Sequence, residues 1–280
     1  MNGNAAEWFI ERHLHEGRAE KAAFVEAWEN GRTLTYGALS EGSARCASAL
    51  LREGVRREER AAMFVLDQIE FPEIFWGALK AGVQPVALNT LLATDVYSRI
   101  LEDSRAGIAF VSHELLDVVL PAAQASEHLR QIVVIGGLAP DGTVSYEDFM
   151  KNAAPAQIAE CVGDEVAFWL YSSGSTGAPK GVRHIHDALR VTCDTYGNQV
   201  LGVTENDTVF SAAKLFFAYG LGNGMSFPMS VGATAYLFNG RPTPDSVSDI
   251  LAIYKPTIYC GVPTLYAAMI QKWEVEGAHP

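Results

Sequence analysis

The sequence has no apolar run close to the roughly 18 residues that a membrane-spanning helix requires. Its first eight residues contain no basic stretch followed by an apolar one, which is the pattern of a secretory signal peptide. We therefore expect that the protein does not span a membrane and that it works in the cytoplasm.

Cysteine and positive charge are also scarce. The four cysteines are far apart and form no C-x-x-C pair, which disfavours a zinc site, a redox motif or a disulfide framework. Acidic residues outnumber basic ones by 33 to 21, and the formal net charge is -12. A surface of that sign repels nucleic acids, although local donors can still bind one small anion. We expect no nucleic-acid partner and no metal ligands in this chain.

The composition is that of a folded protein with a large core. Of the 280 residues, 49% are hydrophobic and only 19% are charged. Short apolar runs alternate with longer segments of helical period, and the apolar runs show no polar alternation. This pattern predicts an α/β fold with mostly parallel sheets flanked by helices, in which the strands are buried on both faces.

The same pattern predicts the individual elements and one boundary. Strands are expected at 22–28, 33–36, 60–66, 85–88, 108–112, 131–135, 166–171, 209–213, 234–238 and 258–260. Helices are expected at 39–51, 71–81, 95–103, 115–125, 188–200, 222–231, 243–254 and 264–272. The Asn30-Gly31 pair indicates a hairpin between the first two strands. The glycine- and proline-containing stretch 136–163 predicts a boundary between two α/β subdomains, residues 1–160 and 161–280.

Residues 171–181 carry most of the chemical information. They read Tyr-Ser-Ser-Gly-Ser-Thr-Gly-Ala-Pro-Lys-Gly. We expect a buried strand before this segment and a helix after it. The glycines allow close approach of the backbone to a ligand, and the hydroxyl and N–H groups can bind an anion. Lys180 adds a positive charge. A polyphosphate site is therefore favoured over a flexible linker. A Walker A loop is disfavoured, because Pro179 and Gly181 flank the lysine.

At these residues the sequence resembles the signature loop of adenylate-forming enzymes, which include acyl-CoA synthetases, luciferases and nonribosomal peptide adenylation domains. Residues 33–36, 82–86 and 263–264 are similar to other segments of that family. Residues 89–92, 211–223 and 241–245 are similar to benzoate–CoA ligases in particular. The resemblance implies that the chain forms part of the large N-terminal domain of the adenylate-forming fold.

The resemblance also implies an activity. It indicates an AMP-forming acid–thiol ligase of aromatic acid degradation that converts benzoate with ATP to benzoyl-AMP and then, with coenzyme A, to benzoyl-CoA. Mg²⁺ is the expected metal cofactor. Phosphate binding is implied for Ser172, Ser173, Gly174, Ser175, Thr176 and Gly177, with Lys180 as the catalytic cation. The acid pocket is implied for Phe217, Ala218, Tyr219 and Gly220.

Other polar residues near these motifs receive no catalytic role. His184 and His186 follow the loop, and we interpret them as structural. The role of Lys214 is left open. For the aromatic residues of 216–219, ordinary core packing is the alternative to a pocket.

The later motifs of the family are not found in this sequence. They carry the adenine, ribose and magnesium contacts and a C-terminal domain with a further lysine. We therefore interpret the chain as an N-terminal fragment that is inactive alone, and an uncovered sheet edge could join two copies as a homodimer. The alternatives are a ligase for another aryl acid, a non-catalytic binding domain of the same fold and, more remotely, a P-loop NTPase.

Overall fold

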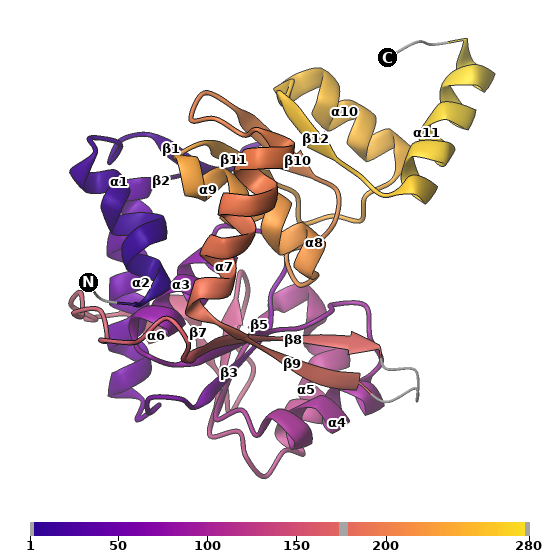
Figure 1. The fold of residues 1–280 in the computed structure, drawn as a ribbon. Helices are drawn as coiled ribbons and strands as arrows, with labels where there is room; N and C mark the ends of the chain where they lie inside the picture. The colour runs from indigo at the N-terminus through magenta and orange to yellow at the C-terminus, as the bar shows by residue number, and fades with distance from the viewer. Residues whose placement is uncertain (1–2, 174–178, 278–280) are drawn as a thin grey trace.

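A computed structural model describes residues 3–173 and 179–277 of the chain. Two sheets form its framework (Figure 1). The larger sheet has the strand order β7-β6-β5-β3-β4-β8-β9, and all of its neighbours are parallel except β8 and β9. Its strands are β3 (Arg60–Phe64), β4 (Gln84–Ala87), β5 (Ile108–Ser112), β6 (Gln131–Ile135), β7 (Val144–Ser145), β8 (Val166–Ser173) and β9 (Pro179–Ile185).

The second sheet combines the beginning of the chain with its later part. Its order is β12-β10-β11-β1-β2, and only the β1–β2 hairpin is antiparallel. The strands are β1 (Ala22–Glu26), β2 (Thr33–Thr35), β10 (Thr208–Ser211), β11 (Thr234–Leu237) and β12 (Ile258–Cys260). Asn30, in the turn between β1 and β2, has a positive φ of 59°, which asparagine tolerates better than most residues. The expected hairpin is therefore confirmed.

The helices lie against both sheets. They are α1 (Arg12–His15), α2 (Tyr36–Arg52), α3 (Glu70–Lys80), α4 (Thr94–Ser104), α5 (Leu116–Gln124), α6 (Tyr146–Met150), α7 (His186–Thr192), α8 (Ala218–Leu221), α9 (Phe227–Val231), α10 (Pro244–Tyr254) and α11 (Pro263–Glu276). π-Helical segments continue some of them: η1 (Glu7–Glu11), η3 (Cys193–Leu201) and η4 (Gly222–Ser226). Among the described residues, no helix is both long enough and apolar enough to cross a bilayer.

Strand residues of the larger sheet are buried on both faces. Ala61 and Met63 of β3 pack into the cluster that contains α2 and α3, whereas Ala62 and Phe64 pack into the cluster that contains α4 and α5. Side chains of a strand alternate between faces, so covering both faces requires an apolar residue at every position. The expected fold class, mostly parallel sheets flanked by helices, is confirmed.

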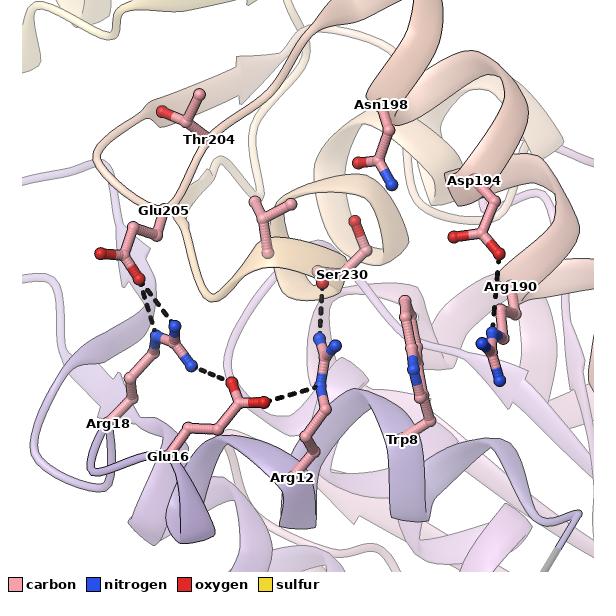
Figure 2. A pocket seen from close by; sticks show the side chains of 11 residues that line it. Trp8, Arg12, Glu16, Arg18, Arg190, Asp194, Asn198, Thr204, Glu205 and Ser230 are labelled. Carbon is pink, nitrogen blue, oxygen red and sulfur yellow. Dashed lines mark hydrogen bonds and ion pairs between the residues drawn. The ribbon is translucent and has the colours of Figure 1, made fainter.

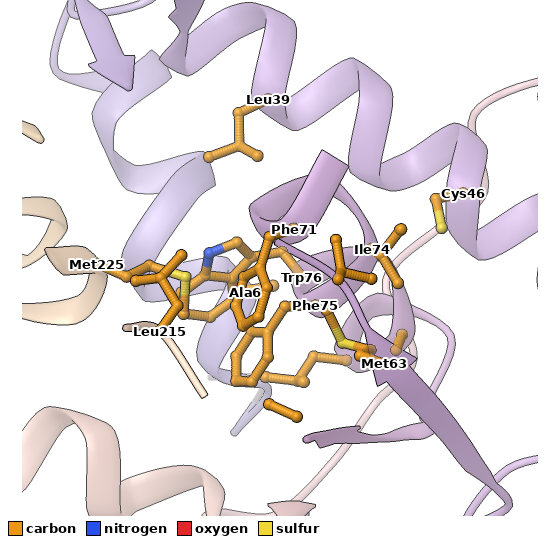
Figure 3. Close-up of a cluster of buried hydrophobic side chains, with 14 of the residues drawn as sticks. Ala6, Leu39, Cys46, Met63, Phe71, Ile74, Phe75, Trp76, Leu215 and Met225 are labelled. Carbon is orange, nitrogen blue, oxygen red and sulfur yellow. The ribbon is translucent and has the colours of Figure 1, made fainter. Parts of the chain in front are cut away.

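Helix α3 is the centre of the main core. Nearly all of its residues are buried, and Phe71, Phe75 and Trp76 are fully buried. Leu215 and Met225, from the part of the chain that follows β10, belong to the same cluster (Figure 3). One continuous core therefore joins the elements of both sheets.

Residues near the N-terminus form a helix, η1 and α1, that was not expected. The indole of Trp8 lies between two guanidinium groups, 4.3 Å from Cζ of Arg12 and 5.3 Å from Cζ of Arg190 (Figure 2). Arg12 also donates a hydrogen bond of 2.6 Å to the carbonyl of Ser230. These contacts connect the N-terminal helix to α7 and α9.

The observed sheets add one strand that was not expected. Residues Pro179–Ile185, for which no strand was expected, form β9; the helix expected at 188–200 is present and begins at His186 as α7, continued by η3. β9 is the last strand in the order of the described strands, and its polar residues fit an edge position. The expected subdomain boundary between residues 160 and 161 stays a prediction, although strand pairs link the two segments. β8 pairs with β4 of the first segment, and β1 pairs with β11 of the second.

Candidate active site

The hairpin of β8 and β9 presents the predicted phosphate-binding segment at the edge of the larger sheet. Ser172 lies opposite Lys180, and Ser173 lies opposite Pro179. Antiparallel pairing therefore brings the first serines of the motif next to its lysine, although they are separated along the chain. The predicted phosphate-binding residues Gly174, Ser175, Thr176 and Gly177 lie outside the described residues.

Side-chain contacts hold this hairpin against the rest of the sheet. The Tyr171 hydroxyl donates a hydrogen bond of 2.5 Å to Asp103 of α4, and the Trp169 indole donates one of 2.8 Å to Gln84 of β4. Gly181 faces both aromatic rings across the hairpin. A Cβ at that position would lie 2.7 Å from the Trp169 ring, so only glycine leaves room for the aromatic side chains.

Two cavities, one of about 540 Å³ and one of about 610 Å³, are lined by residues of different chemistry. The smaller one, near Trp8, is lined by arginines that are paired with carboxylates, as Arg190 is with Asp194 at 3.5 Å (Figure 2). Its charges are already compensated, so it offers no obvious site for an anion.

The larger cavity lies beside the β8–β9 hairpin and is mostly apolar. Its walls come from α4 and the loop before it, from both strands of the hairpin and from the start of α8. They are Asn89, Leu92, Val96, Ile100, Leu170, Tyr171, Ser172, Pro179, Val182, His184, Phe216, Phe217 and Ala218. Ser172, predicted to bind phosphate, and Phe217 and Ala218, predicted to bind the acid, thus line one cavity.

Among the predicted residues that the structure describes, Tyr219, Gly220 and Lys180 do not line this cavity. Tyr219 is 45% exposed, and its hydroxyl donates a hydrogen bond of 3.2 Å to the carbonyl of Gly261. Gly220 is buried, and a Cβ there would lie 2.0 Å from the carbonyl oxygen of Lys214. Glycine is therefore required for the turn that positions Phe217. Lys180 is exposed, beside the hairpin wall. The catalytic and binding roles of all these residues stay predictions.

Two histidines after the motif differ in position. His184 lines the cavity and stacks on Phe168, with ring centroids 4.7 Å apart and an angle of 6° between the planes. Burial lowers its pKa. His186 is buried, accepts a hydrogen bond of 3.2 Å from the N–H of Ala5, and has a pKa lowered to about 4 by burial. Both imidazoles are therefore neutral near pH 7.

His184, Val182 and the residues of α4 were not predicted as site residues. Had the strand β9 been recognised, its period of two would have placed Val182 and His184 on one face. Val96 and Ile100 are one helical turn apart, a spacing that also occurs in ordinary core packing. Within residues 3–173 and 179–277, no group of three or more His, Cys, Asp or Glu side chains is placed to hold a metal ion.

A second apolar cavity, of about 330 Å³, shares Phe216 and Phe217 with the larger one. Both rings line it, together with Asp67 and Lys214. The two phenylalanines therefore form a wall between the cavities. Asp67 was not predicted, because nothing near it in the sequence indicates its hydrogen-bond partner Leu215, 148 residues away.

Comparison with known proteins places these features in context. The family described as AMP-binding enzyme matches residues 10–279. The chain is 47% identical over 271 residues to a 4-hydroxybenzoate–CoA/benzoate–CoA ligase of Rhodopseudomonas palustris, covering 95% of this chain and 49% of that protein. It is 46% identical over 268 residues to a benzoate–CoA ligase of Thauera aromatica, covering 95% of this chain and 50% of that protein.

Solved structures give a similar result. A benzoate CoA ligase from Burkholderia xenovorans is 44% identical, with a TM-score of 0.86, over 96% of this chain and 52% of that one. An anthranilate CoA ligase in complex with anthranoyl-AMP is 35% identical, with a TM-score of 0.90, over 95% of this chain and 51% of that one. The chain therefore spans about half the length of the relatives that it matches.

Proposed function

Because the chain belongs to the AMP-binding enzyme family, we propose that it is the part of an AMP-forming acid–CoA ligase that binds an aromatic carboxylate and the phosphates of ATP. The observation that supports this most directly is the cavity of about 610 Å³, which Ser172 shares with Phe217 and Ala218. An acid held there would lie next to the phosphate-binding hairpin.

Benzoate is the acid that we propose first. The cavity walls are mostly apolar, and the small side chain of Ala218 leaves space beside the ring of Phe217, which suits a flat aromatic ring. 4-Hydroxybenzoate is the second candidate, because Asn89 and the neutral His184 on the wall could form a hydrogen bond with a ring hydroxyl. The names of the relatives include both acids.

The proposed chemistry has two steps. An oxygen of the carboxylate attacks the α-phosphorus of ATP, the bond to the β-phosphate breaks, and pyrophosphate leaves. The thiol of coenzyme A, after losing its proton, then attacks the carbonyl carbon of the acyl-adenylate and displaces AMP. The first step brings two anions together, so alignment and charge neutralisation dominate its barrier.

The residues of this chain have distinct roles in the proposal. The Ser172 hydroxyl, together with Ser173 and the residues Gly174, Ser175, Thr176 and Gly177, donates hydrogen bonds to the phosphate oxygens. Lys180 opposes the negative charge of the phosphates. Magnesium would supply further neutralisation when bound, but none of the described residues is assigned as its ligand.

Binding and turnover can be measured separately on the 280-residue chain. We expect ligand-observed NMR to show binding of benzoate in preference to acetate, which has the carboxylate without the ring. We expect Lys180→Ala to weaken ATP binding while Lys151→Ala, at an exposed lysine on another part of the surface, leaves it unchanged. A chain that binds neither benzoate nor ATP would contradict the proposal.

Benzoate-dependent exchange between ATP and pyrophosphate then distinguishes an enzyme from a binding domain. Exchange by the 280 residues would mean that they suffice for adenylation, contrary to our expectation. Binding of both ligands without exchange would assign to this part of the protein the positioning of substrates, and would leave the chemistry to a longer chain.

A further inference from the structure

Two turns, one from each sheet, meet at the wall between the cavities. Asp67 lies just beyond the carboxyl end of β3, and Lys214 lies just beyond the carboxyl end of β10. Asp67 Oδ2 and Lys214 Nζ are 3.9 Å apart, and the exposed fractions of the side chains are only 6% and 16%. In α/β sheets, the carboxyl ends of parallel strands are the usual place for ligand-binding groups. This pair joins such ends in two different sheets.

The Asp67 carboxylate also holds the backbone of the wall. Both of its oxygens accept the N–H of Leu215, at 3.2 and 3.4 Å. The Leu215 side chain is buried in the central core. The buried Phe216 and the half-exposed Phe217 follow it in the sequence. Asp67 thus holds the backbone of the residue that directly precedes the two phenylalanines.

Lys214 fixes the same segment through contacts with Phe238. Its ammonium group donates a hydrogen bond to the carbonyl of Phe238 and lies 5.1 Å from the centre of the Phe238 ring. This hydrogen bond therefore connects the segment after β10 with Phe238, the residue that follows β11. Because glycine at position 220 packs against the carbonyl of Lys214, a shift of the lysine would also move the start of α8.

Burial makes the two charges depend on each other. Desolvation raises the pKa of Asp67 to about 6 and lowers the pKa of Lys214, while each charge favours ionisation of the other. Removing one partner of a buried pair leaves the other charge without compensation, which usually costs more than the pair itself contributes. A local rearrangement of the wall would relieve that cost.

We propose that Asp67 and Lys214 are a positioning pair that fixes the wall of Phe216 and Phe217 between the two cavities and so limits the size of the acid that the larger cavity accepts. The part about acid size rests on the proposed function. The part about the wall does not, because it concerns only the contacts of this chain.

The variants separate the charge from the hydrogen bond. Asp67→Asn keeps an oxygen that can accept the Leu215 N–H but removes the charge, whereas Asp67→Leu removes both. Lys214→Met removes the other charge at similar length, and Lys214→Arg keeps it. Lys80→Met is the matched control, because Lys80 is 1% exposed and pairs with Glu11 at 2.7 Å, away from both cavities.

Hydrogen exchange of the amides in residues 215–221 reports the wall directly. We expect exchange there to be at least about tenfold faster in Lys214→Met and Asp67→Leu, intermediate in Asp67→Asn, and close to the unchanged protein in Lys214→Arg. Lys80→Met is expected to lower the melting temperature without this local effect. If Asp67→Leu does not fold, Lys214→Met and Asp67→Asn carry the comparison.

The ratio of the dissociation constants for 2-naphthoate and benzoate tests the consequence for acid size. We expect this ratio to fall at least about fivefold in Lys214→Met and to be restored in Lys214→Arg. Unchanged exchange in residues 215–221, or the same change in Lys80→Met, would overturn the positioning pair. Faster exchange with an unchanged ratio would overturn the limit on acid size. Faster exchange in a protein that binds neither acid would retain the positioning pair and reject the proposed function.

Discussion

Phe216 and Phe217 are neighbours in the sequence with different surroundings. Phe216 is 3% exposed, whereas Phe217 is 46% exposed, although their ring centroids are only 4.4 Å apart. Core packing, the alternative considered for both, therefore describes Phe216 better than Phe217. An exposed aromatic ring on an apolar cavity wall is a reasonable surface for binding a second aromatic ring.

Enlarging Ala218 tests this assignment. We expect Ala218→Phe to place a ring in the cavity and to raise the dissociation constant of benzoate at least about tenfold. Ala252→Phe, at an exposed position of α10, adds the same apolar group elsewhere and is expected to leave affinity unchanged. Titration of both variants with benzoate is the measurement, and equal affinities would remove Ala218 from the pocket.

Glu73 of α3 predicts a pH dependence of stability. Burial, reinforced by the nearby charge of Glu70, raises its pKa to about 7, and the Tyr146 hydroxyl donates to it at 3.3 Å. Between the ordinary glutamate pKa and about 7, the folded protein keeps a proton that the unfolded chain releases. This group therefore makes the protein less stable as pH rises through that window.

Glu73→Gln removes the titration but keeps an acceptor for Tyr146. We compare the free energy of unfolding of the variant with that of the unchanged protein. We expect this difference to shift in favour of the variant by on the order of 1–3 kcal/mol as the pH rises from 5 to 8. Urea unfolding at both pH values gives the comparison, with Glu147→Gln, an exposed residue of α6, as the control. A constant difference between the two proteins at both pH values would contradict the assignment.

Among single residues, the sequence motifs predicted Ser172, Phe217 and Ala218 as site residues, and these three line one cavity. They could do so because the family pattern is local in sequence. The pairing of Asp67 with Lys214 was not predicted, because it depends on how two sheets meet. Gly174 to Gly177 lie outside the described residues, so their predicted contacts with phosphate remain predictions.

Helices α2 and α3 show how small residues set the distance between elements. A Cβ on Gly77 would lie 2.7 Å from Cβ of Cys46 and 2.9 Å from the carbonyl oxygen of Ser43. A Cβ on Gly42 would lie 2.4 Å from Oε1 of Glu73. The two helices therefore approach each other at positions without side chains, which lets the apolar α3 pack at the centre of the core.

Gly77→Ala should destabilise the protein even though alanine favours helices. The helical gain is about 1 kcal/mol, and overpacking against a backbone oxygen costs about 3 kcal/mol, so a net loss of roughly 2 kcal/mol is expected. Urea unfolding measures this loss. Cys46→Ala should not restore stability, because Ser43 is still in place; full restoration would contradict the backbone clash. Ser48→Ala, elsewhere on α2, serves as the control.

Most elements could be predicted because their apolar runs are long and bounded by turn signals. The strands β5, β6 and β12 begin and end at the expected residues. β9 was missed because an edge strand carries polar residues and lacks the continuous apolar run of a central strand. The N-terminal helix was missed because its stabilising contacts, such as that of Arg12 with Ser230, come from residues distant in sequence.

At the scale of the whole molecule, the chain crosses between the sheets more often than its sequence suggests. A boundary near residue 160 was a reasonable expectation from the glycine and proline content. Pairing between distant strands links the two expected segments, as β1 joins β11, and the boundary itself stays a prediction. Composition reports where a chain turns, but it does not report which strands pair after the turn.

The outer edge of the smaller sheet predicts self-association. No described strand pairs with the outer side of β12, and nearby α11 exposes Ile270 and Val275 at 52% and 83%. We expect dimers of the 280-residue chain at high concentration in sedimentation experiments. Ile270→Lys should reduce dimerisation, whereas Val200→Lys, at an exposed site on η3, should not. A monomer at all concentrations would contradict this expectation.

The parallel pairing of β1 with β11 also has a consequence for synthesis on the ribosome. Phe24 of β1 lies beside Ala235 of β11, so about 210 residues must be added before the partner strand exists. At the usual rate of about 5–20 residues per second, that interval is roughly 10 to 40 s. During this time the nascent β1–β2 hairpin presents an unpaired edge, while the larger sheet can already assemble. The order of translation therefore makes the smaller sheet the last part of the framework to form, and it makes the early hairpin the segment most in need of a chaperone.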